Sequence, residues 1–113
     1  MKLRRNHSKL SDEQLLLAFA KRNDSDAIGE LWKRYSRLVY GLCLNILKSK
    51  EDATDAVNGI FEKLLNAENN ESVHSFKSWI YTVSKNHCLQ ILRKQQRRNL
   101  IMNDFIHTEV KPT

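Results

Sequence analysis

Helix breakers and strand patterns are both scarce in this chain of 113 residues. It contains three glycines and a single proline, Pro112, which lies close to the C-terminus. Long helices can therefore run without interruption. No segment alternates Val, Ile and Thr in the manner of a half-buried strand. These absences predict an all-α protein.

No apolar run is long enough to cross a membrane. The longest one, residues 38–47 (LVYGLCLNIL), is about half of the roughly 20 residues that a transmembrane helix needs. The N-terminus, MKLRRNHSKL, is polar after Leu3 and lacks the apolar centre of a signal peptide. We therefore expect no membrane insertion and a cytoplasmic protein.

Cysteine is rare, and the histidines lack the partners of a catalytic or metal site. Cys43 and Cys88 each lie within an apolar helical pattern and lack the close partners of a zinc site or a disulfide framework. His74 and His87 are not accompanied by a carboxylate, a nucleophilic serine or a metal-ligand cluster at useful spacing. The sequence predicts reduced cysteines, no metal site, no cofactor and no enzymatic activity.

One long segment lacks negative charge. Residues 75–98 (SFKSWIYTVSKNHCLQILRKQQRR) contain six Lys and Arg residues and no acidic residue. The whole chain carries a net charge of +6, so this segment accounts for much of the positive excess. A local excess of this kind indicates a polyanionic partner.

At helical spacing this segment presents two distinct faces. Four apolar side chains fall on one face and predict a buried stripe: Phe76, Ile80, Val83 and Ile91. Beside it runs a ridge that mixes an aromatic ring, an amide and guanidinium groups: Trp79, Thr82, Asn86, Leu89, Arg93 and Arg97. Such a ridge suits nucleic acid, because cations neutralise phosphates, an amide reads a base edge and a ring supports an unstacked base. Trp79 taken alone is more typical of a core residue.

Capping signals mark three earlier helices. They are Ser11 with Gln14 before a helix that ends near 21–23, Asp24 or Ser25 before a helix over about 27–47, and Ser49 with Asp52 before a helix over 50–66. With the basic segment they predict about four helices in a single compact domain, orthogonal or bundle-like, over residues 11–98. Residues 1–10 are expected to form a flexible basic N-terminus, and residues 99–113 the start of a linker or tail.

Two polar features flank the basic helix. The outer face of the helix over 50–66 carries Asp55, Asn58 and Glu62 at steps of three and four, which solvation and the helix dipole are sufficient to explain. Residues 66–74 form a polar, Asn-rich connection that would stand beside the basic helix as a wall for an extruded base.

Three segments in order resemble region 2 of the sigma-70 family of bacterial transcription initiation factors, in the extracytoplasmic-function group: residues 11–47, 52–65 (DATDAVNGIFEKLL) and 75–94 (SFKSWIYTVSKNHCLQILRK). The resemblance implies a sigma region 2-like domain that docks on the clamp-helix coiled coil of the beta-prime subunit of core RNA polymerase. It also implies recognition of the minus-ten promoter element, with the non-template strand held as the duplex opens. The resemblance is also compatible with an anti-sigma factor as a further partner.

The resemblance also implies particular polymerase contacts. The family's D-x-V-Q-E core corresponds to Asp55, Val57, Asn58 and Gly59, so the implied contacts are Asp55 and Asn58, with Glu62 on the same ridge. Asn58 is one methylene shorter than the usual Gln, and Gly59 replaces an acidic side chain. These departures imply a weaker or differently distributed polymerase contact.

On the basic helix, Asn86 matches a family position implicated in promoter reading. The expected DNA-binding residues are Lys77, Trp79, Thr82, Lys85, Asn86, Leu89, Arg93, Lys94 and Arg97. Thr82 and Val83 stand where broadly acting members carry adjacent aromatics, which implies a narrower promoter repertoire. No pattern for the family's region 4 follows, so we expect a fragment of a longer factor. The alternative is a helical protein-interaction module without a DNA-binding role, in which the basic ridge is a solvated face.

Overall fold

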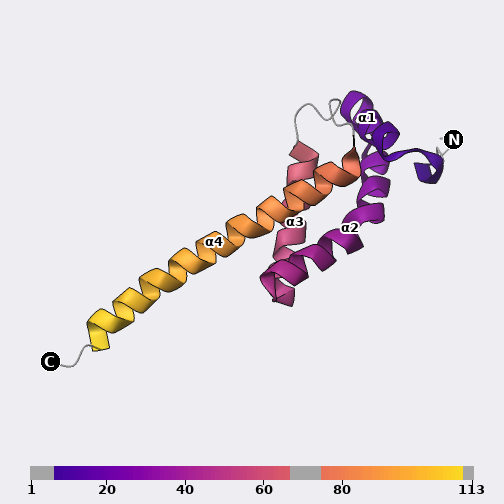
Figure 1. Cartoon of the computed structure of the whole chain (residues 1–113). Coiled ribbons are helices and arrows are strands. Elements are labelled where there is room, and N and C mark those ends of the chain that lie inside the picture. The colour runs from indigo at the N-terminus through magenta and orange to yellow at the C-terminus, as the bar shows by residue number, and fades with distance from the viewer. Residues whose placement is uncertain (1–6, 67–74, 111–113) are drawn as a thin grey trace.

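The computed structural model describes residues 7–66 and 75–110, with side chains as far as Asn103. Within these ranges the chain forms a short 3-10 turn and four α-helices, and no strand (Figure 1). The elements are η1 (His7–Lys9), α1 (Asp12–Arg22), α2 (Ser25–Leu47), α3 (Lys50–Asn66) and α4 (Phe76–Val110). The predicted all-α class and number of helices are confirmed.

Each α-helix begins at a side chain that accepts hydrogen bonds from its own first turn. The Ser11 hydroxyl accepts from the N–H of Gln14 at 3.1 Å, and the Gln14 side chain accepts from the N–H of Ser11 at 2.8 Å, which is the predicted capping box. Asp24 caps α2, and Ser49 and Ser75 cap α3 and α4. The capping signals therefore fix where the helices start.

The first three helices follow one another through very short links. Asn23 ends α1 and Lys48 ends α2 in the left-handed conformation, with φ of 52° and 61°. Each is followed at once by the next capping residue, so only two residues separate consecutive helices. Such links force α1 and α3 to pack beside α2.

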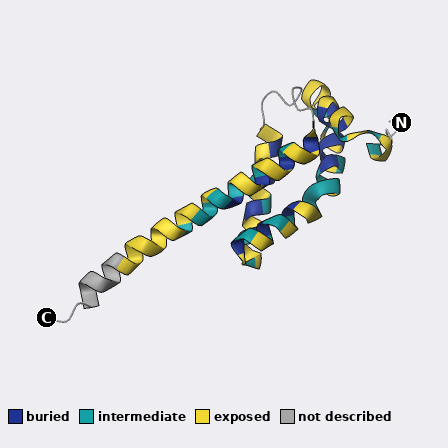
Figure 2. Ribbon diagram, viewed as in Figure 1, coloured by how far each residue is buried: buried dark blue, intermediate teal, exposed yellow. Residues whose placement is uncertain are grey.

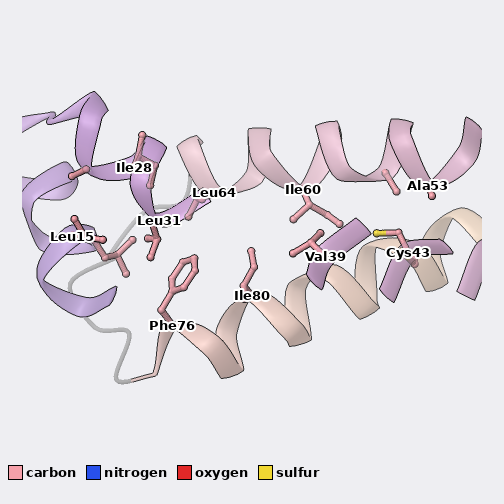
Figure 3. Close-up of a cluster of buried hydrophobic side chains, with 14 of the residues drawn as sticks. Leu15, Ile28, Leu31, Val39, Cys43, Ala53, Ile60, Leu64, Phe76 and Ile80 are labelled. Atoms are coloured by element: carbon pink, nitrogen blue, oxygen red, sulfur yellow. The ribbon is translucent and has the colours of Figure 1, made fainter. Parts of the chain in front are cut away.

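The core lies where α2 meets the other three α-helices. Phe76 and Ile80 of α4 point toward Leu31 of α2 and toward Ile60 and Leu64 of α3 (Figure 3), and all five side chains are almost completely buried. The ring centroid of Phe76 also lies 5.2 Å from that of Tyr35, at an angle typical of edge-to-face packing. The start of α4 is thereby held at the centre of the fold.

The buried stripe of α4 differs in part from the predicted one. Phe76 and Ile80 are buried as expected, but the stripe continues through Ser84 and Cys88, in steps of four, while Val83 and Ile91 are half-buried beside it. The small side chains of Ser84 and Cys88 let α4 approach its neighbours closely. Cys88 and Cys43 are free thiols at this crossing, and burial raises the pKa of Cys43 to about 12.

Only the first part of α4 is packed. Gln95 makes the last hydrogen bond from α4 to the other helices, to Asp52 at 3.0 Å. Every described side chain over residues 96–103 is exposed, and α4 runs on past Arg98 to Val110, away from the body (Figures 1 and 2). The radius of gyration is 19.2 Å, against about 13 Å for a compact domain of this length. We call residues 76–95 the packed segment and residues 96–110 the free segment.

Candidate functional site

The outward face of α4 carries most of the predicted DNA-binding residues. The exposed ones are Lys77, Thr82, Lys85, Asn86, Arg93, Lys94 and Arg97, whereas Trp79 and Leu89 are half-buried. The ring centroid of Trp79 lies 5.7 Å from that of Phe76, so its indole packs on the core, as expected for that residue taken alone. The others are exposed, but Lys94 lies two and a half turns after Lys85 and therefore on the opposite side of α4, beside His87.

This face stays open because the buried stripe uses the opposite side of the helix. Residues 75–103 include no acidic side chain, and none of the cations on α4 forms an ion pair with another described residue. Their charges therefore add to a positive potential along α4. That is the electrostatic pattern of a surface that binds phosphates.

A pocket of about 390 Å³ opens on the same face, between α2 and the start of α4. It is lined by Leu38, Lys77, Ser78, Tyr81 and Thr82. Tyr81 is 50% exposed and Leu38 is 52% exposed, which is unusual for large side chains with so much apolar surface. The pocket combines an aromatic ring, an aliphatic wall, hydroxyl groups and a cation, which is a suitable lining for a planar base attached to a phosphate.

Sequence reasoning missed Leu38, Ser78 and Tyr81. A signal for Tyr81 was present, because it stands four residues after Lys77 and four before Lys85, and such spacing places an aromatic ring between two cations on one helix face. Leu38 comes from another helix, and its position beside Tyr81 depends on how α2 crosses α4. No local pattern contains that information.

The acidic ridge on α3 has the geometry that its spacing predicts. Asp55, Asn58 and Glu62 are all exposed. Neither carboxylate forms an ion pair with another described residue. Ala56, Ile60 and Leu64 bury the other side of α3 in the core, so the helix is rigidly supported beneath the ridge. The ridge is therefore an unpaired polar surface, open to a partner.

The densest polar cluster is structural. The Arg34 guanidinium of α2 donates to the Asp12 carboxylate at 3.0 Å and to the carbonyl oxygens of His7 and Ser8, and the Tyr35 hydroxyl donates to Asp12. Burial, followed by the hydrogen bond to Asp12, raises the pKa of Tyr35 to about 12. The cluster fastens η1 and α1 to α2 and satisfies its own groups, so it offers nothing to a ligand.

Three further expectations concern absences and the connecting segment. No group of three His, Cys, Asp or Glu residues in the described ranges is arranged to hold a metal ion. None of the described helices is long and apolar enough to span a membrane. The proposed base-holding wall at 66–74 lies outside the described residues after Asn66.

Comparison with known families identifies one match. The family model for sigma-70 region 2 matches residues 31–98. The matched range includes most of α2, all of α3 and the packed segment of α4, so it contains the acidic ridge, the exposed basic face and the pocket. No curated protein and no solved structure matches the chain.

Proposed function

The chain belongs to the sigma-70 family through its region 2, and we propose that it is the promoter-reading and polymerase-docking domain of an alternative sigma factor of the extracytoplasmic-function group. Family membership gives it a role in promoter recognition and in binding RNA polymerase. The finer proposal is that α4 holds the non-template strand of the minus-ten element while α3 docks on the beta-prime clamp helices. Polymerase docking and promoter binding both place the protein in the cytoplasm.

The observation that carries this proposal is the exposed face of α4 over residues 76–98, which is free of acidic residues and has a pocket at one end. Phosphates of a single strand would lie along Lys85, Arg93 and Arg97, which fix its position without reading sequence. Asn86 lies among them with its amide exposed, and an amide can both donate to a base edge and accept from it. Positioning and reading are thus combined on one helix.

The pocket is the proposed binding site for an unstacked base. A base entering it would stack on the Tyr81 ring and contact Leu38, and Lys77 would neutralise the adjoining phosphate. Stacking on an aromatic side chain is worth about 1–3 kcal/mol per base, which offsets much of the energy needed to unstack that base from the duplex. Capture of single-stranded DNA in this way favours an open promoter.

On α3, the ridge formed by Asp55, Asn58 and Glu62 is the proposed polymerase contact. Its two unpaired carboxylates suit a basic partner surface such as a coiled coil with exposed Lys and Arg. The two proposed surfaces lie on different helices that pack against each other, so one rigid body can hold polymerase and DNA together.

A titration of the labelled chain with core RNA polymerase tests docking. We expect saturable binding that a competing clamp-helix peptide abolishes. Asp55→Ala should weaken it by about tenfold or more, because a charged hydrogen bond is lost. Glu13→Ala removes an exposed carboxylate from α1 and serves as the matched control. Equal affinities for Asp55→Ala and the parent chain would contradict the proposed contact.

One observation favours a second candidate, a helical protein-interaction module. Leu100, Ile101 and Met102 on the free segment are each more than half exposed, at 65%, 62% and 52%. Exposed apolar side chains at successive positions of a helix suit a protein partner, for example an anti-sigma factor. Salt separates the two candidates: binding to single-stranded promoter DNA should weaken steeply with salt if phosphates are contacted, whereas a module without a DNA role would not bind that DNA.

A further inference from the structure

Gly59 of α3 lies directly against His87 of α4. A Cβ atom added to Gly59 would lie 2.8 Å from both Cε1 and Nε2 of the His87 ring, and 3.9 Å from Cδ2. Favourable separations between such atoms are about 3.5–4.0 Å. The imidazole therefore occupies the space in which a side chain at position 59 would begin.

The other two glycines have no such neighbour. A Cβ atom added to Gly29 or Gly41 would meet nothing within 4 Å outside its own helix. All three glycines lie inside α-helices and have negative φ, so none is required by backbone conformation. Gly59 is the one whose lack of a side chain makes room for another residue.

The two nitrogens of the His87 ring have different surroundings. Nδ1 is buried and has no hydrogen-bond partner among the described residues, whereas Nε2, at the Gly59 edge of the half-buried ring, is not a buried unpaired atom. Lys63 of α3 and Lys94 of α4 lie nearby, and burial, followed by these two charges, lowers the pKa of His87. The ring is therefore neutral near pH 7 and leaves Nε2 as its accessible hydrogen-bonding group.

Position 59 adjoins the acidic ridge. Gly59 lies four residues after Asp55 and three before Glu62, so it is a neighbour of both carboxylates on the helix surface. The resemblance of the sequence to the family places an acidic side chain at this position. Here the nearest side-chain atoms come from α4 instead.

We propose that His87 takes the place of the missing side chain at position 59 and contributes its Nε2 edge to the polymerase-docking surface. This inference rests on the proposed function of the ridge and deepens it. The docking surface then spans α3 and α4, and it offers polymerase a neutral imidazole where the family pattern has a negative charge. His87 is one residue after Asn86, so the helix that reads promoter DNA also touches the polymerase.

The physical contact is tested by thermal unfolding of four variants. Gly41→Ala, in open space, should raise Tm by about 4 °C through helix propensity. Gly59→Ala should raise it less, or lower it, because the ring must move. In a His87→Ala background, Gly59→Ala should give the full gain seen at Gly41. Equal gains at Gly59 and Gly41 in the parent chain would overturn the contact.

The docking role is tested by titration with core RNA polymerase. His87→Ala should weaken binding by about two- to tenfold, the range expected for one lost hydrogen bond. The double variant Gly59→Glu with His87→Ala should recover the affinity, because a side chain again grows from position 59. Gln96→Ala is the control, since it is exposed and lies two and a half turns along α4, on the opposite face.

Asp55→Ala in the same titration distinguishes the docking role of the ridge from that of His87. If Asp55→Ala weakens binding and a folded His87→Ala variant binds like the parent, the contribution of His87 is overturned and the ridge stands. If neither substitution changes affinity, the ridge itself is not the docking surface and both proposals fall. Circular dichroism on each variant establishes that it is folded before binding is measured.

Discussion

The packed and free segments of α4 belong to one helix, yet their surroundings are opposite. Their charges differ too, because the packed segment has cations and no acidic residue, whereas the free segment also contains Asp104 and Glu109. In the packed segment every fourth residue from Phe76 to Cys88 is buried, and the cations are exposed. Over 96–103 all side chains are exposed, including three large apolar ones. The end of the packed body is therefore not the end of the helix.

Helix propagation explains this difference. Starting a helix is unfavourable, but extending an existing one adds a hydrogen bond for each residue fixed. The packed segment supplies the nucleus, and residues 96–110 contain neither Gly nor Pro, so nothing stops the helix near Arg98. Burial ends beside the link between α2 and α3, where Gln95 contacts Asp52, whereas the helix continues to Val110.

The largest expected effect is the difference in unfolding free energy between two isoleucine substitutions, one in each segment. Ile80→Ala should lower the free energy of unfolding by about 2–5 kcal/mol, because Ile80 is fully buried and its removal leaves a cavity. Ile101→Ala should change it by less than about 0.5 kcal/mol, because Ile101 is 62% exposed. Urea denaturation measures both. A large loss at Ile101 would mean that the free segment is packed.

Sequence reasoning was most accurate where the signal is local. The capping box at Ser11 and the bounds of the helix over 50–66 agree with the structure, because capping depends on residues within one turn. The buried stripe of α4 was predicted in part. Periodicity identifies buried positions by their apolar side chains, so it did not predict Ser84. Ser84 is fully buried because its small size suits the helix crossing.

The site shows the same division. The exposed cations of α4 and the ridge on α3 follow from helical spacing, and their exposure agrees with it. The pocket requires Leu38 from α2, and the filling of position 59 requires His87 from α4. Both depend on how helices cross. The sequence alone indicates that an acidic side chain is missing at Gly59, whereas the structure shows that the His87 ring lies in that space.

A second, smaller effect compares DNA contacts on the two segments. Asn86→Ala, in the packed segment, should reduce discrimination between promoter sequences by about 1–3 kcal/mol while binding to unrelated single strands changes little. Arg97→Ala, in the free segment, should weaken binding to all sequences alike and reduce the slope of log K against log salt by about 0.7. Fluorescence anisotropy over a salt series measures both quantities.

The control for this pair is Lys21→Ala, which removes an exposed cation from α1. Its salt slope should equal that of the parent chain. If Asn86→Ala kept the full sequence preference, base reading would have to be assigned to another residue, and the Tyr81 pocket would be the first place to look. If Arg97→Ala altered preference rather than affinity, the free segment would read bases instead of positioning phosphates.

The smallest expected effect comes from ending the chain after Arg98. The core would lose nothing, because no described side chain beyond that residue is buried. The free energy of unfolding should therefore stay within about 0.5 kcal/mol of the parent value, while helicity by circular dichroism falls. The radius of gyration by X-ray scattering should drop from 19.2 Å toward about 13 Å. A shortened chain that lost stability would show that residues 99–113 support the body, and the domain boundary expected at residue 98 would have to move toward the end of α4.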